Sequence, residues 1–101
     1  SQKEKRRQTA LRETLEEAGL RGVLSASSIK VKAMSADENQ TSNHIKFFAM
    51  QVEDVLENWS ENELRERRWV DLHDLPEDEM IKRDIEILKS PKFRIMIEEL
   101  L

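Results

Sequence analysis

Three glutamates, Glu13, Glu16 and Glu17, are the residues whose type and spacing indicate chemistry. Because they are three and four positions apart, a helix with about 100° per residue would bring them to one face. Carboxylates this close repel one another on an ordinary helix, whereas a hard divalent cation would turn that repulsion into attraction. Mg²⁺ and Mn²⁺ prefer such oxygen ligands. Arg12, four positions before Glu16, can hold that carboxylate in a fixed rotamer.

The same spacing is also typical of an acidic helix face that is only solvated, because glutamate is common in helices. The opposite side of the segment is suited to contact a core. Its residues are Leu11, Thr14, Leu15 and Ala18. Gly19 follows at a position typical of a left-handed helix C-cap. We therefore predict a helix over residues 8–18 that carries the carboxylates on a rigid element.

Two strand regions are predicted after this helix. Residues 23–34 alternate in part between apolar and lysine side chains, which is typical of a short strand or a strand pair. Residues 45–52 form a short apolar run between polar segments, which favours a strand, with a buried helical turn as the alternative. Residues 35–44 are uniformly polar and are predicted to form an exposed loop.

The last third of the chain mixes strand and helix signals. Residues 54–66 fit a strand end followed by either a polar connection or a short helix around Trp59. Residues 67–72 are predicted as a strand with Trp69 in the core. A helix is predicted over residues 77–89, and Ser90 is the expected N-cap of a final helix. The order helix, strands, helices indicates an α+β fold, with C-terminal helices over about residues 77–101.

Length and charge limit the classes of function. The chain has 101 residues, enough for one domain, and 17 basic against 21 acidic side chains give a net charge of −4. Residues 1–32 hold 8 basic and 4 acidic groups, a local +4, while the other 9 basic and 17 acidic groups give −8. This distribution suits an anionic, metal-bound ligand better than DNA, so no DNA partner is expected. The absence of cysteine excludes disulfides and thiolate metal sites.

The sequence also bears on location. It contains no apolar run long enough for a transmembrane helix, and its charged first residues lead into no apolar signal-peptide core. The lack of cysteine fits a reducing compartment. We therefore expect a cytoplasmic protein, extending to the nucleus, with no membrane partner.

Residues 12–20 (RETLEEAGL) resemble the second half of the Nudix box, G-x5-E-x7-R-E-U-x-E-E-x-G-U, in which U is aliphatic. Glu4 falls at the earlier glutamate, seven residues before Arg12. Thr14 departs from the pattern at one U position. The opening glycine would precede Ser1, so the resemblance implies a Nudix domain that is incomplete at its N-terminus, with residues 1–101 as its C-terminal portion.

A second resemblance narrows the family. Residues 55–59 (VLENW) and 65–70 (RERRWV) are similar to segments of the diphosphoinositol polyphosphate phosphohydrolases and of their diadenosine polyphosphate-cleaving relatives. This resemblance implies metal-dependent hydrolysis of a pyrophosphate bond in a phosphorylated small molecule. It also implies a mixed sheet with flanking helices, an α/β/α sandwich, with the missing strands supplied by an unseen segment or another chain.

The resemblance also implies roles for single residues. Glu13, Glu16 and Glu17 would bind Mg²⁺ or Mn²⁺, Glu13 is the candidate general base, and Arg12 would orient a glutamate. Glu4 would support the site, and one of three later glutamates would complete it. These later candidates are Glu53, Glu61 and Glu63. The alternatives are a catalytically silent Nudix-like binding module, an inactive fragment, or a small interaction domain with an accidental motif.

Several cations are candidates for contact with a phosphorylated substrate. Arg65 and Arg67 precede Trp69, and an arginine fork pairs well with phosphate oxygens. Surface ion pairs with nearby glutamates are an equally weighted alternative for these arginines. Lys46 is a further candidate, although a solvated lysine is common. His44 is expected to be exposed. Trp59 has two possible roles, stacking on the base of a nucleotide substrate or packing within the protein.

Overall fold

The computed structural model describes residues 1–32 and 44–101. Its elements follow the chain in the order α1 (Gln2–Ala18), β1 (Leu20–Lys32), β2 (His44–Val55), a 3-10 turn (Glu77–Glu79), α2 (Lys82–Lys89) and α3 (Pro91–Leu100). The predicted exposed loop over residues 35–44 lies outside the described residues, except for His44, which begins β2. None of the described helices is long and apolar enough to cross a membrane.

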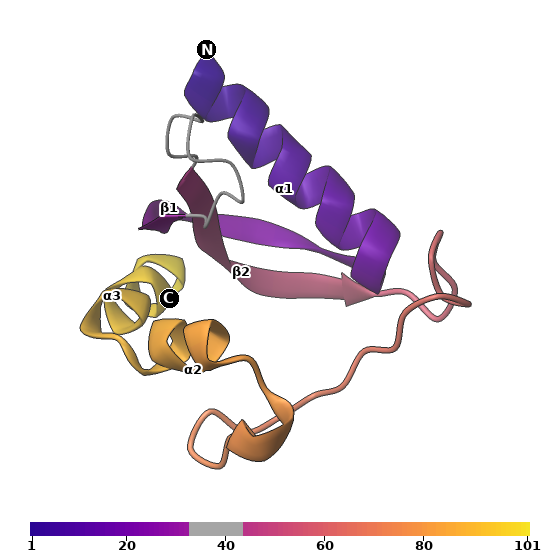
Figure 1. The fold of residues 1–101 in the computed structure, drawn as a ribbon. Coiled ribbons are helices and arrows are strands. Elements are labelled where there is room, and N and C mark those ends of the chain that lie inside the picture. Colours follow the sequence, from indigo (N-terminus) through magenta and orange to yellow (C-terminus); the bar gives the residue numbers. More distant parts are fainter. Residues whose placement is uncertain (33–43) are drawn as a thin grey trace, which may run out of the picture.

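The helices lie on both sides of a two-stranded sheet. Figure 1 shows α1 along one face of the β1–β2 pair, with α2 and α3 on the other side. The two strands are antiparallel, and the sheet has the order β1-β2. Within the described residues, this arrangement confirms the predicted α+β class with flanking helices.

Helix α1 is longer than the 8–18 prediction. The apolar periodicity used for that prediction begins only at Leu11, yet the helix starts at Gln2. The Ser1 hydroxyl accepts a hydrogen bond from the backbone N–H of Glu4 at 3.3 Å, which caps the first turn. Lysine, arginine, glutamine and glutamate are good helix formers, so the polar residues 2–7 continue the helix without an apolar face.

The sheet contains a bulge that a buried serine fills. The register passes from Leu24 opposite Met50 to Ser28 opposite Phe48, so β1 has extra residues at this point. Ser25 is 0% exposed. Its hydroxyl donates to Ser27 O at 2.7 Å and accepts from the backbone N–H of Ala49 at 3.1 Å. The hydroxyl therefore replaces ladder hydrogen bonds that the bulge interrupts.

The core lies mainly between the sheet and α3. Its buried apolar residues are Leu24, Ala49 and Met96, and Met96 on α3 is 1% exposed. Ser90 caps α3 as predicted, since its hydroxyl accepts from Phe93 N at 3.2 Å and Pro91 is the first helical residue. From the other end of α3, Glu99 accepts hydrogen bonds from the backbone and hydroxyl of Ser27 at 3.2 and 2.9 Å.

Two predictions for the last third are wrong. Residues 67–72 form no strand, since Asp71 makes only an isolated bridge with Asp74, and Trp69 is 67% exposed instead of buried. The helix predicted over residues 77–89 is broken, because Met80 and Ile81 are extended and separate the 3-10 turn from α2. Ile81 is consequently 62% exposed. The apolar spacing that predicted one helix is divided between two short elements.

Candidate functional site

The C-terminal end of α1, which carries the glutamates, is held by the segment that follows β2. An α-helix leaves its last four carbonyl groups without partners inside the helix. In this chain all four accept hydrogen bonds: Leu15 O from Gly19 N (3.0 Å), Glu16 O from Glu61 N (3.0 Å), Glu17 O from Trp59 Nε1 (3.0 Å) and Ala18 O from Arg67 Nη1 (2.8 Å). The orientation of the glutamate-bearing turn is therefore fixed by tertiary contacts.

Arg67 and Trp59 form the centre of this attachment. We call these two side chains, which hold the end of α1, the clamp. The guanidinium of Arg67 stacks over the Trp59 ring at 4.1 Å from its centroid. It also donates to Leu56 O, and a cation at a helix C-terminus is favourable for the helix dipole. These contacts give Arg67 a structural role, and its predicted binding of substrate stays a prediction.

Gly19 ends α1 in the left-handed conformation that the sequence predicted, with φ of 66°. The clamp leaves no room for a side chain there. A Cβ atom on Gly19 would lie 2.8 Å from the Cβ of Trp59 and 2.9 Å from an Arg67 nitrogen. Glycine is thus required both by its backbone conformation and by the close approach of the clamp.

A second attachment holds the N-terminal half of α1. Arg7 donates to Ser25 O at 2.8 Å and to Leu24 O at 3.4 Å, both on β1. Its guanidinium also lies 5.4 Å from the centre of the Phe48 ring on β2. The helix is therefore bound to the sheet in its N-terminal half and to the segment after β2 at its C-terminal end.

Three predicted site residues line one hollow between α1 and the sheet. Glu13 and Glu17 enter it from the helix and Lys46 enters it from β2, around a volume of about 220 Å³. Leu24, Phe47 and Met50 supply apolar walls. Two carboxylates and one ammonium group thus share a partly apolar hollow, which is a suitable setting for a cation and a phosphate.

Glu16 and Arg12 do not line that hollow and are exposed. At 3.6 residues per turn, Glu13 and Glu17 differ by about 40° around the helix, whereas Glu16 and Glu17 differ by about 100°. Within residues 1–32 and 44–101, no three acidic or histidine side chains converge as ready-made metal ligands. The structure therefore brings Glu13 and Glu17 together, and the three-glutamate metal site stays a prediction.

Arg65 lies beside the glutamate pair. Its Nη2 is 3.6 Å from a carboxylate oxygen of Glu17, and its Nε is 2.9 Å from Oε1 of Glu61. The hydrogen bond that Arg65 donates to Glu61, followed by the charge of Glu17, raises the pKa of Arg65, so the guanidinium stays charged throughout the neutral range. Arg65 thus neutralises part of the negative charge at the helix end.

Among the three later glutamates, the structure brings Glu61 to the glutamate turn. Its backbone N–H binds Glu16 O, and its carboxylate shares Arg65 with Glu17. Glu53 and Glu63 are exposed. The sequence reasoning missed Lys5, Arg6 and Thr9, which line a neighbouring hollow with Glu13. Their signal was the helical repeat of Lys5, Thr9 and Glu13 at intervals of four residues.

Comparison with known families agrees with the geometry. A family model described as NUDIX domain matches residues 1–90, so the chain belongs to the Nudix family. Nudix hydrolase 4 of Arabidopsis thaliana is 39% identical over 70 residues, which cover 69% of this chain and 33% of that relative. The matched part thus spans about a third of the relative's length. No solved structure matches the chain significantly. The family resemblance read in residues 4–20 is confirmed.

Proposed function

We propose that the chain carries the metal-binding helix of a pyrophosphohydrolase that uses Mg²⁺ or Mn²⁺. The observation that supports this proposal best is the shared hollow of Glu13, Glu17 and Lys46 on the helix of a Nudix family member. Hydrolysis of a pyrophosphate bond needs positive charge near the phosphate oxygens and an activated water. The hollow combines metal-ligating oxygens with an ammonium group.

The donor chemistry fits a hard divalent cation. The carboxylates of Glu13 and Glu17 are oxygen ligands, and both side chains are accessible from solvent. Glu16 is the proposed third ligand, reached by a change of side-chain rotamer on the exposed face. A bound divalent cation supplies Lewis acidity toward a phosphate oxygen and lowers the pKa of a bound water.

The remaining roles fall to residues around the glutamates. Glu13 is proposed as the general base that takes a proton from water, because it alone of the glutamates lines both hollows beside α1. Arg12 is proposed to orient Glu16, four positions along the same helix. Arg65 is proposed to release Glu17 to the metal and to pair with a phosphate oxygen instead.

The proposed substrates are diphosphoinositol polyphosphates or dinucleoside polyphosphates. The similarity of residues 55–59 and 65–70 to hydrolases of these compounds supports this class. The clamp gives that similarity a physical meaning, since Trp59 and Arg67 belong to those two segments and fix the glutamate turn. In this proposal residues 1–101 are the C-terminal portion of one Nudix domain in a cytoplasmic and nuclear enzyme, completed by further strands.

The test combines a metal titration with hydrolysis assays on the complete protein. Mn²⁺ should bind the wild type, and Glu17→Gln should weaken binding at least about 100-fold, because a ligand should matter more than a second-sphere partner. Glu86→Gln on α2 removes the same charge from an exposed site and should leave binding unchanged. Hydrolysis of diadenosine polyphosphate should follow metal occupancy. Metal binding equal in wild type and Glu17→Gln would refute the proposal.

A catalytically silent Nudix module is the second candidate. It is favoured by one observation, that no three metal ligands converge in the described part of the chain. This candidate predicts that polyphosphates bind without divalent cations being needed and without hydrolysis. Substrate binding in EDTA, together with zero turnover in millimolar Mn²⁺, would favour it over the hydrolase.

A further inference from the structure

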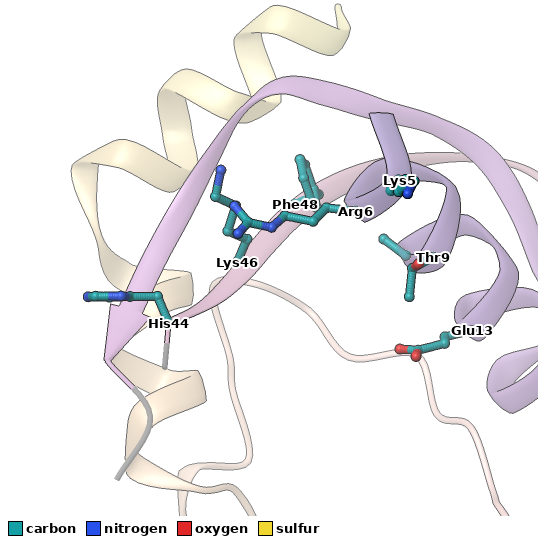
Figure 2. Close-up of a pocket in the computed structure, with 8 residues that line it drawn as sticks. Lys5, Arg6, Thr9, Glu13, His44, Lys46 and Phe48 are labelled. Carbon is teal, nitrogen blue, oxygen red and sulfur yellow. The ribbon is translucent and has the colours of Figure 1, made fainter. Parts of the chain in front are cut away.

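A second hollow, which shares Glu13 and Lys46 with the first, lies between the first half of α1 and the start of β2. Its volume is about 270 Å³, just below the range of roughly 300–1,000 Å³ for small-molecule sites. Lys5 and Arg6 line it from α1, and Lys46 and Phe48 line it from β2. Figure 2 shows the Arg6 side chain extending from the helix toward Lys46, while His44 points away from the helix.

Among residues 1–32 and 44–101, the cations that line this hollow outnumber the carboxylates that line it. Lys5, Arg6 and Lys46 face a single carboxylate, that of Glu13. Within the described residues none of these three cations forms an ion pair, although the chain has a net charge of −4. Other cations are paired with carboxylates, namely Arg65, Arg68, Arg83 and Lys89.

Arg7, the next residue along α1, does not line this hollow. Arg7 directs its guanidinium to two carbonyl groups of β1 and to Phe48, so it attaches the helix to the sheet. Lys5 and Arg6 instead line the hollow with Lys46. The consecutive residues Lys5, Arg6 and Arg7 are therefore divided between an anion-binding surface and a structural contact.

We propose that Lys5, Arg6 and Lys46 bind the non-reacting phosphoryl groups of a polyphosphorylated substrate. An arginine fork and two ammonium groups match the oxygens of a short phosphate chain, which fits a hollow of this size. The inference rests on the proposed function, because Glu13 lines both this hollow and that of Glu17. A phosphate chain lying along α1 would place one end at these cations and the other at the glutamates.

The shared carboxylate makes a specific prediction about the order of binding. Without a metal, the negative charge of Glu13 opposes an anion in the cationic hollow. Metal at the glutamates removes that opposition, so metal and polyphosphate should bind cooperatively. Glu13→Gln should therefore strengthen metal-free polyphosphate binding, although it should weaken metal binding.

The experiment is a calorimetric titration of the complete protein with inorganic tripolyphosphate in EDTA. We expect the double variant Arg6→Gln/Lys46→Gln to raise the Kd at least tenfold, and Glu13→Gln to lower it severalfold. Lys92→Gln, which removes one exposed cation from α3, is the control and should leave the Kd unchanged. A gain of binding in Glu13→Gln supports the anion site independently of the double variant, because loss of folding would not increase affinity.

The outcomes separate this inference from the proposed function. Equal binding by the wild type and the double variant, or equal losses in the double variant and Lys92→Gln, overturns the anion site even if the protein hydrolyses polyphosphates. Binding that responds as expected, with no hydrolysis in Mn²⁺, supports the anion site and refutes the proposed hydrolase. No tripolyphosphate binding by the wild type also overturns the inference.

Discussion

The guanidinium carbon of Arg67 lies 4.1 Å from the centre of the Trp59 ring, and both side chains donate hydrogen bonds to the last turn of α1. This stacked pair connects a turn after β2 to the helix that bears Glu16 and Glu17. The segment after β2 therefore has a structural role, to hold the end of α1, which the basic charge of this segment did not indicate.

Arg67→Lys should destabilise the protein by about 1–3 kcal/mol, because a lysine cannot reproduce the fork that reaches Ala18 O and Leu56 O while stacking on Trp59. Urea unfolding followed by tryptophan fluorescence measures the change. Arg68→Lys is the matched control, since Arg68 is exposed and pairs only with Glu79 within the described residues. Equal effects of the two variants would contradict the structural role of Arg67.

Gly19→Ala should destabilise the protein by about 1–2 kcal/mol from the left-handed backbone, and further through contact with Trp59. Gly19→Asn separates the two causes, because asparagine tolerates the left-handed conformation but still carries a Cβ. We expect Gly19→Asn to remain destabilised in thermal unfolding, because its Cβ still meets Trp59, but less so than Gly19→Ala. A fully stable Gly19→Asn protein would show that the Trp59 contact is unimportant.

Arg65→Gln should increase affinity for Mn²⁺ by about two- to fivefold, since it frees the Glu17 carboxylate from an exposed ion pair. The pKa of Arg65 is raised, so its charge, and the stabilisation it gives, would be lost only in strongly alkaline solution. The gain should therefore be the same at pH 6 and pH 9. Metal titration checks this, with Arg68→Gln as the variant of equal charge; a gain in both would point to net charge alone.

Ser25→Ala should cost about 1–3 kcal/mol of unfolding free energy, because it leaves the buried Ala49 N–H without the hydroxyl acceptor at the bulge. Ser60→Ala, at an exposed turn position, should change stability by less than about 0.5 kcal/mol. Chemical denaturation compares the pair. If Ser25→Ala is as stable as the wild type, the bulge does not depend on the hydroxyl.

Sequence patterns predicted the elements whose signals are local. The Gly19 cap, the strand over residues 45–52 and the Ser90–Pro91 helix start are all confirmed, because each depends on residues within one or two turns. The strand around Trp69 failed, since the short apolar pattern of residues 67–72 did not reveal whether a sheet edge was available for pairing. The helix predicted over residues 77–89 failed for a similar reason, because its apolar spacing did not reveal the extended backbone at Met80 and Ile81.

The sequence by itself determined the family and the spacing of the glutamates, because a motif of fixed intervals on one helix is a local property. Tertiary structure decided which of them face a common hollow: Glu13 and Glu17 meet Lys46, while Glu16 turns away. It also divided the basic residues, giving Arg7 and Arg67 to helix attachment and Lys5 and Arg6 to an open hollow. These assignments depend on side chains from distant segments, whose approach is set by packing and not by sequence separation.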